Sequence, residues 1–333
     1  MRKLAILLTG LIMLTTFSAT SKELKFAVVP KFNSVFFDQS KYGCEDGAKE
    51  LANVSCIYVG PNQADVRTQD QIIQKLIDEG VDGIAVAVAQ SQFLADHSMQ
   101  KAKDAGVPIV TYDSDFEPSI LKEYGKLRLA YIGTNNFELG KALGEQLKVQ
   151  RPVGGTLIIQ SGRPDSPNLN LRIMGIRSAL SGKQYATPPG DILNNDNGWT
   201  EAREPYFNYD QIPRAVKQLE QVIVGKWPHV NSFTSVGGWT QNDEGVYKSV
   251  VSPYKQKLTD KEMVIVVSDA SATQLQLLQD KLATANVGQS PYEMGRQAIL
   301  TLYKIVNGEQ YDEIIYTPLN VCTQQNYDTC TKK

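Results

Sequence analysis

The sequence predicts an α/β protein built from two lobes, each a doubly wound, Rossmann-like parallel sheet. From residue 24 onward, short apolar segments alternate with amphipathic segments of helical spacing. Continuous apolar strands separated by helices are typical of a parallel sheet that is covered on both faces. The alternation repeats after about residue 130, and the roughly 310 residues that follow the N-terminal export signal exceed what one hydrophobic core usually serves. We therefore expect two similar domains with a ligand site in the cleft between them.

The expected elements follow the chain in order. The strands of the first half are expected at residues 24–29, 56–59, 83–88 and 107–112. Its helices are expected at residues 36–52, 65–79 and 93–105. The strands of the second half are expected at residues 130–133, 156–160, 232–236 and 263–267. Its helices are expected up to residue 148 and at residues 171–180, 212–224 and 244–254.

Two carboxylates, Asp113 and Asp115, follow the strand at residues 107–112. In a doubly wound sheet the carboxyl ends of the strands open onto the ligand crevice, so these side chains are the first candidates for ligand contact. Because strand side chains alternate between faces, the pair is expected to point the same way, with Ser114 turned aside. Such a pair accepts hydrogen bonds from hydroxyl groups or binds a cation. The alternative is that one of them caps the next helix or pairs with a surface lysine.

The N-terminus has the composition of a secretory signal peptide, assigned to residues 1–21. Met1-Arg2-Lys3 is a positive segment, residues 4–17 are largely apolar, and cleavage is expected just after Ala19. No later stretch approaches the ~18 to 20 apolar residues of a membrane span, so a free periplasmic protein of a two-membrane bacterium is expected. The formal charge of −2 gives no long-range attraction for nucleic acid.

The four cysteines fall into two local pairs. In an oxidising compartment Cys44 is expected to bond Cys56, and Cys322 to bond Cys330. Loops this short predict roughly 2 to 3 kcal/mol of stabilisation each in the chain-entropy model. Zinc is the competing interpretation, but the sequence has two histidines, and neither lies at ligand spacing from a cysteine. We expect no metal and no cofactor.

A set of short landmarks in a fixed order carries a family resemblance. They are residues 29–37 (VPKFNSVFF), 80–84 (GVDGI), 105–115 (AGVPIVTYDSD) and 131–136 (YIGTNN), with Arg172 followed by Gly175. The chain resembles the periplasmic sugar-binding proteins of the ribose-binding type over nearly all of its mature length. The resemblance implies three hinge strands crossing near Gly133, near Gly288-Gln289 and near Thr317. The lobes would then be residues 22–133 plus 289–316 and residues 134–288 plus 317–333.

The resemblance also implies sugar contacts from the first lobe. Asn33 and the pair Phe36-Phe37 match a polar residue and two aromatics that stack on a sugar ring, although one phenylalanine could belong to the core. Lys31 matches a ligand lysine of the relatives that bind autoinducer-2. Those relatives and the rhamnose binders share the Asp-Ser-Asp ending seen at Asp113 to Asp115, which moves the expected ligand away from ribose.

Contacts from the second lobe and the hinge are implied in the same way. Arg172 matches the arginine of the family's Arg-x-x-Gly element, and Asn170 competes with it for the ligand. Asp269 matches an aspartate at a strand end, and Gln289 matches a hinge glutamine. Trp239 stands near the place of a family asparagine and either stacks on the ligand or packs against its loop. One of the aromatics at residues 199–209 is a further candidate for stacking.

These features predict a binder that acts without catalysis. The sequence lacks a nucleophile elbow, a phosphate-binding loop and a dinucleotide fingerprint. As neighbours two residues apart on one strand, Asp113 and Asp115 are expected on the same side of a bound sugar, whereas glycosidases place their two carboxyl groups on opposite sides of the bond that they cleave. We expect a monomer that captures a small sugar or polyol by hinge closure and delivers it to an ABC permease. The alternative is a receptor that presents its ligand, including autoinducer-2-like signals, to a membrane sensor.

Overall fold

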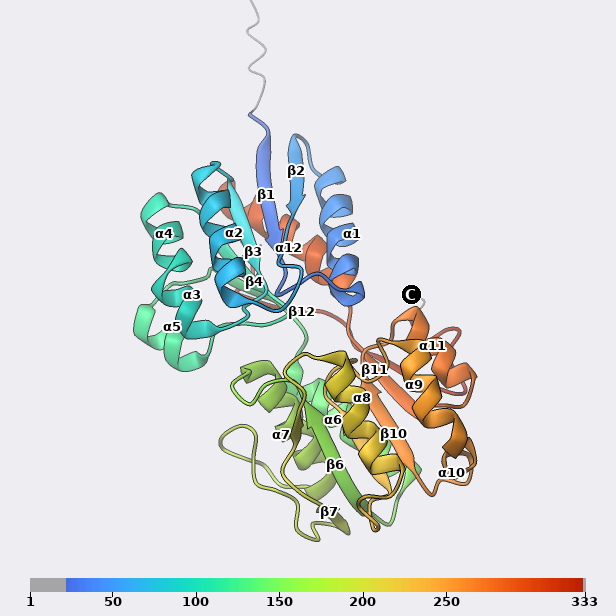
Figure 1. Cartoon of the computed structure of the whole chain (residues 1–333). Coiled ribbons are helices and arrows are strands. Elements are labelled where there is room, and N and C mark those ends of the chain that lie inside the picture. The colour runs from blue at the N-terminus through green and yellow to red at the C-terminus, as the bar shows by residue number, and fades with distance from the viewer. Residues whose placement is uncertain (1–21, 332–333) are drawn as a thin grey trace, which may run out of the picture.

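The computed structural model describes residues 22–331, which form two α/β lobes (Figure 1). The signal peptide assigned to residues 1–21 lies outside the described residues. The first lobe contains β1 (Leu24–Val29), α1 (Val35–Lys49), β2 (Val54–Tyr58), α2 (Val66–Asp78), β3 (Gly83–Val86), α3 (Ser91–Asp96), α4 (Ser98–Ala105), β4 (Ile109–Tyr112), α5 (Pro118–Tyr124), β5 (Ala130–Gly133), α12 (Pro291–Val306) and β12 (Ile314–Tyr316). The second lobe contains α6 (Asn136–Gln150), β6 (Gly155–Ser161), α7 (Pro167–Ser181), β7 (Trp199–Glu201), β8 (Tyr206–Phe207), α8 (Ile212–Ile223), β9 (Ser232–Ser235), α9 (Glu244–Val251), the 3-10 turn η1 (Ser252–Tyr254), α10 (Lys255–Thr259), β10 (Val264–Ser268), α11 (Ala272–Gln279), β11 (Ala285–Gly288) and β13 (Asn320–Thr323).

The sheet of the first lobe is parallel throughout its described pairings. Its strand order is β12-β5-β4-β3-β1-β2. Helices α1 and α12 pack on one face, where Phe26 and Val28 of β1 meet Met294 and Ile299 of α12. Helices α2 to α5 cover the other face. The predicted doubly wound architecture is confirmed for this lobe.

The sheet of the second lobe repeats the plan with one antiparallel edge. Its order is β13-β11-β10-β9-β6-β7, with β8 paired to β6 and β13 antiparallel to β11. Helices α6 and α7 pack on one face around Leu143 and Ile176. Helices α8, α9 and α11 cover the other face around Leu219, Tyr247 and Leu277. Two doubly wound lobes are therefore present, as the alternation predicted.

The chain passes between the lobes where β5, β11 and β12 end. After β5 it enters α6 of the second lobe, after β11 it returns to α12 of the first lobe, and after β12 it crosses again to β13 (Figure 1). The first and last crossings are joined by a hydrogen bond from the Thr317 N–H to the Gly133 carbonyl at 2.8 Å. The lobe ranges 22–133 plus 289–316 and 134–288 plus 317–333 stay a prediction.

Both expected disulfides are confirmed. Cys44 and Cys56 join α1 to β2 with their Cα atoms 5.9 Å apart, and Cys322 and Cys330 close the C-terminal segment with their Cα atoms 5.3 Å apart. Each bond ties a short loop, so it acts locally within one lobe.

Some elements differ from the sequence prediction. The helix expected at residues 93–105 is two helices that meet at His97, whose φ of −120° and ψ of −95° are not helical. The helix expected from residue 171 begins earlier, at Pro167, a residue well suited to a first helical turn. None of the helices between residues 22 and 331 is long and apolar enough to cross a membrane.

Candidate ligand-binding cleft

Asp113 lies directly after β4, at the carboxyl edge of the first sheet. Strand β4 ends at Tyr112, and Asp113 has a φ of +58° in the left-handed region. Its side chain is 5% exposed, and one carboxylate oxygen lies 3.4 Å from Nζ of Lys31, which follows β1. The Ser114 hydroxyl is turned away and donates to the Val88 carbonyl at 2.8 Å. Lys31 and Asp113 therefore form a charged pair at the ends of two strands.

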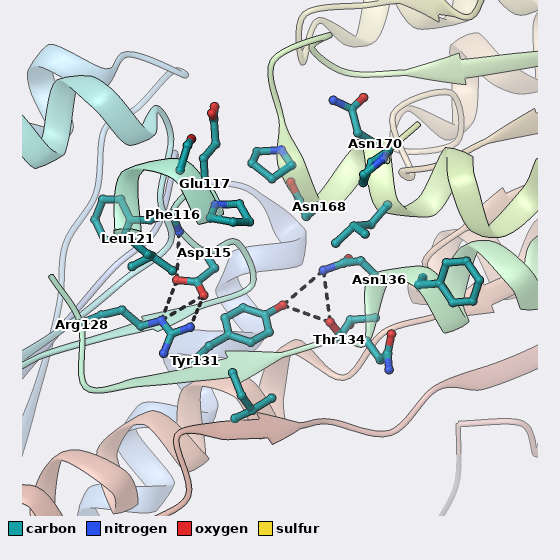
Figure 2. A pocket seen from close by; sticks show the side chains of 18 of the residues that line it. Asp115, Phe116, Glu117, Leu121, Arg128, Tyr131, Thr134, Asn136, Asn168 and Asn170 are labelled. Carbon is teal, nitrogen blue, oxygen red and sulfur yellow. Dashed lines mark hydrogen bonds and ion pairs between the residues drawn. The ribbon is translucent and has the colours of Figure 1, made fainter. Parts of the chain in front are cut away.

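Asp115 has different partners, so the expected alternation of the two carboxylates is wrong. The strand has ended before Asp113, and the left-handed backbone there breaks the two-residue period. Arg128 holds the Asp115 carboxylate with hydrogen bonds of 2.6 to 3.0 Å, and the Thr111 hydroxyl adds one of 2.7 Å. The alternative of a structural ion pair describes this contact, with an arginine in place of the lysine. Figure 2 shows Asp115 and Arg128 on the wall of a neighbouring cavity.

Asp269 repeats in the second lobe the arrangement of Asp113 in the first. It follows β10 with a φ of +74°, and its carboxylate accepts hydrogen bonds from Gln289 at 2.7 Å and from the Gly238 N–H at 3.0 Å. Burial raises the pKa of this carboxyl, the nearby Arg172 charge acts in the opposite direction, and the negative charge of Asp113 raises it further. The negative charges of Asp113 in the first lobe and Asp269 in the second therefore repel each other.

A buried hydrogen-bond network at the hinge holds Gln289. The Gln289 side-chain oxygen accepts from the Thr134 hydroxyl and from Nη2 of Arg172, both at 2.8 Å. Nε of Arg172 donates to Oδ1 of Asn136 at 2.8 Å, and Nη1 donates to the Val236 carbonyl at 2.7 Å. Arg172 is 2% exposed, and each of its three guanidinium nitrogens has a protein partner. Arg172 is thus buried and supports Gln289, which in turn donates to Asp269. Contact of Arg172 with a ligand stays a prediction.

The two phenylalanines after β1 pack against the same core but differ in burial. Phe37 is 4% exposed and makes edge contacts with Phe32, Phe36 and Tyr112 at centroid distances of 5.8, 5.0 and 6.2 Å. Phe36 is half-buried and leaves part of its ring open, so it is the better candidate for stacking on a ring. Asn33 is exposed and donates to the Gly60 carbonyl and to Asn62.

Asp210 is a cleft residue that sequence reasoning missed. It comes shortly after the two-residue strand β8, has a φ of +61°, and its carboxylate lies beside the Trp239 side chain at Gly162. Burial raises the pKa of the Asp210 carboxyl, and the positive charge of Lys31 acts most strongly against that rise. Lys31 belongs to the first lobe, where it pairs with Asp113, and Asp210 belongs to the second, so this charge interaction acts between the lobes. The signal in the sequence was weak, since a two-residue strand has no readable apolar pattern.

The remaining predicted contacts come from the second lobe. Half-buried Trp239 packs against the core of that lobe beside Asp210, so both alternatives for it remain open. Of the aromatics at residues 199–209, Tyr209 is 41% exposed and lies below the guanidinium of Arg214, 4.8 Å from its ring centroid. Asn170 donates to the Pro164 carbonyl at 2.9 Å and lines the cavity of Figure 2 instead of joining the Asp113 cluster.

The cluster formed by Lys31, Asp113, Asp210 and Asp269 is rich in hydrogen-bond acceptors. Lys31 pairs with Asp113 and its charge also acts on Asp210, while the charge of Arg172 acts on Asp269, so three carboxylates face two cations. Partly desolvated carboxylates disfavour further negative charge and favour donors such as hydroxyl groups. The arrangement is suited to a neutral, polyhydroxylated molecule held from both sides.

Comparison with known proteins agrees with the two-lobed fold. Residues 26–310 match the periplasmic binding protein domain. The chain belongs to the periplasmic binding protein family. The family resemblance seen in the sequence is thereby confirmed, and the family is one of periplasmic ligand binders.

Individual relatives of this periplasmic binding protein are distant in sequence but cover most of its length. It is 23% identical to the xylose/arabinose-binding protein of Sulfolobus acidocaldarius over 88% of this chain and 68% of that protein. It is 21% identical to the ribose import binding protein of Bacillus subtilis over 92% of this chain and 90% of that protein. The crystal structure of an ABC transporter solute-binding protein from Burkholderia graminis, in complex with D-arabinose, matches with a TM-score of 0.78 and 27% identity, covering 93% of this chain and 99% of that one.

Proposed function

We propose that this protein captures a small neutral sugar or sugar-like polyol by closing its two lobes and delivers it to an ABC importer. The proposal rests on the ion pair of Lys31 with Asp113 at the edge of the first lobe and on Asp269, which the hinge residue Gln289 holds at the edge of the second. The charge of Lys31 acts on Asp210, and that of Asp113 acts on Asp269, between the two lobes. Each charged group comes from a strand end or the loop after it, where ligands of parallel sheets bind. A molecule placed among them touches both lobes at once.

The chemistry of the cluster supports a hydroxylated ligand. Sugar hydroxyls can donate to the carboxylates of Asp113, Asp210 and Asp269, which compensates the desolvation of their charges. The partly exposed side chain of Phe36 offers an apolar surface for the C–H face of a sugar ring. Further proposed contacts or supports are Asn33, Phe37, Trp239 and Gln289. Three residues act outside the central cluster: Arg172, Asn170 and Asp115.

Transport is favoured over sensing by the relatives. The Bacillus subtilis protein is an import binding protein, and the Burkholderia graminis protein is an ABC transporter component with bound D-arabinose. Ligand contacts from both lobes would stabilise the closed form, and a permease would recognise that closure. Export to the periplasm and a monomeric state are part of the proposal. The two disulfides support an oxidising compartment.

Calorimetric titration with a panel of sugars tests the proposal. The panel contains D-arabinose, D-xylose, D-ribose, D-allose, L-rhamnose, myo-inositol and autoinducer-2. We expect one of the neutral sugars or polyols to bind, and Asp113→Ala or Asp269→Ala to weaken it by about 1.5 to 3 kcal/mol, or roughly 10- to 150-fold. The control is Asp78→Ala, which removes a 66% exposed carboxylate of the first lobe and should leave affinity unchanged. Absence of sugar binding, or full affinity in both cleft variants, would refute the proposal.

A further inference from the structure

A second compartment lies between the lobes beside the hinge. Figure 2 shows this cavity, which has a volume of about 770 Å³. One wall is the segment 115–121 of the first lobe, the opposite wall is the segment 165–171 of the second, and residues 131–137 with β12 form its base. Its lining includes none of the four residues of the charged cluster. The volume falls in the range of about 300 to 1,000 Å³ that is typical of small-molecule sites.

The walls of this cavity combine amides with aromatic and aliphatic side chains. Asn135, Asn136, Asn168 and Asn170 supply the amides; Phe116, Leu121, Phe137, Leu171 and Tyr316 supply the apolar area. Of its three carboxylates, Asp115 pairs with Arg128 at 2.6 Å and Asp165 pairs with Arg163 at 2.9 Å. The third, Glu117, has no ion pair among the described residues and can accept from a ligand hydroxyl. Apolar planes beside hydrogen-bonding amides are suited to an uncharged ring that carries hydroxyl groups.

Asn168 provides an independent sign of a missing donor. Its side chain is 6% exposed and lies on the cavity wall, yet its Oδ1 atom has no hydrogen-bond partner among the described residues (Figure 2). A buried carbonyl oxygen without a donor costs free energy, and such atoms are rare in folded proteins. The Oδ1 atom itself is closed to solvent, so the Asn168 amide has to turn toward the cavity before a ligand hydroxyl there can donate to it.

The cavity is also connected to the charged cluster through buried hydrogen bonds. Asn136 on the cavity wall donates to the Tyr131 hydroxyl and to the Thr134 carbonyl (Figure 2), and it accepts from Arg172. Arg172 and Thr134 both donate to Gln289, which in turn donates to Asp269. A molecule that orders the cavity wall therefore acts on the same hinge network that holds the cluster.

We propose that this cavity is a second binding compartment for a neutral, hydroxyl-bearing ring, held by Asn168 and the aromatic walls. The inference rests on the proposed function and extends it. The ring is either the second unit of a disaccharide whose first unit occupies the charged cluster, or a separate sugar molecule. Because the cavity walls come from both lobes, its occupant stabilises the arrangement of the lobes in which the cavity has this shape.

Calorimetric titration of cavity variants tests this inference. Leu171→Trp fills the cavity from the second lobe, Ser119→Trp fills it from the first, and Asn168→Ala removes the unpartnered acceptor. The ligands are the tightest monosaccharide of the panel above and the disaccharides maltose, lactose, melibiose and xylobiose. Melting curves of each variant confirm folding, and the two tryptophan variants back each other up if one fails to fold.

The outcomes separate the two sources of the ring. Disaccharide binding that falls at least tenfold in the cavity variants, with monosaccharide affinity unchanged, supports a two-unit ligand. Binding of two monosaccharides by the wild type and of one by the tryptophan variants supports a separate molecule. A single monosaccharide with no disaccharide binding, and no effect of the three variants, overturns the inference and leaves the proposed function intact. Absence of any sugar binding overturns both.

Discussion

Replacing Arg172 with methionine should destabilise the second lobe by about 3 to 5 kcal/mol. Arg172 is 2% exposed and donates hydrogen bonds of 2.7 to 2.8 Å to Asn136, Val236 and Gln289. Hydrogen bonds to charged groups contribute about 1.5 to 3 kcal/mol each, and a buried acceptor left without its donor costs about 1 to 3 kcal/mol. Methionine keeps much of the volume but leaves these acceptors without donors. The free energy of unfolding should fall accordingly.

Tryptophan fluorescence during urea unfolding measures this loss in the right part of the molecule. The three tryptophans of the chain, Trp199, Trp227 and Trp239, all lie in the second lobe with Arg172. The matched control is Arg163→Met, which removes an arginine that also makes two hydrogen bonds to a carboxylate, but at a pair that is 39% and 46% exposed. A surface pair of this kind contributes about 0 to 1 kcal/mol.

The result also decides the role of Arg172. Sugar affinity should fall together with stability, because Gln289 and Asp269 lose their support and the pKa of the Asp269 carboxyl loses its main lowering influence. Unchanged stability with lost affinity would mean that Arg172 contacts the ligand directly. That outcome would refute the supporting role assigned here.

Three further changes probe the cleft and the first lobe. Asp210→Asn keeps the size of the side chain and removes a carboxylate whose pKa is raised by burial. Protonated Asp210 therefore favours folding at low pH, and this contribution is lost as pH rises through the folded pKa. Melting curves should show the ligand-free variant more stable than wild type at pH 7, with a difference in midpoint that narrows toward pH 4, and a constant difference would contradict this. Lys31→Met removes the cation that faces Asp113 and Asp210, so calorimetry should show sugar affinity lower by about 1.5 to 3 kcal/mol, whereas unchanged affinity would place Lys31 outside the site. The double variant Cys44→Ala/Cys56→Ala removes the disulfide between α1 and β2 and should lower the unfolding free energy of the first lobe by about 2 to 3 kcal/mol. Circular dichroism during denaturation measures this loss, and equal stability of the variant and the oxidised wild type would contradict the stabilising role of the bond.

The sequence was informative wherever function follows from local pattern. Apolar strands separated by amphipathic helices predicted both sheets, and the positions of Asp113 and Asp269 just after strands β4 and β10 predicted their place at the cleft. The two disulfides were predictable because the number of cysteines is even and they fall into two pairs that are close in the sequence. These features depend on neighbours within a few residues.

Features that depend on tertiary contacts were missed or left open. Asp115 was paired with Asp113 by strand alternation, but the left-handed backbone at Asp113 ends that period and Arg128, 13 residues further on, takes the carboxylate. Asp210 reaches the cleft through β8, a strand too short to leave a pattern. The position of Arg172 behind Gln289 depends on residues more than 100 positions apart, which no local pattern encodes.

The most direct test of the account is the distance between the lobes with and without sugar. The four native cysteines are disulfide-bonded, so spin labels can be attached at Lys122→Cys on α5 of the first lobe and Gln184→Cys after α7 of the second. Double electron–electron resonance should show a shorter and narrower distance distribution once the tightest sugar of the panel is added, and the Asp269→Ala variant should keep the ligand-free distribution at the same sugar concentration. An unchanged distribution at saturating sugar would contradict capture between two closing lobes.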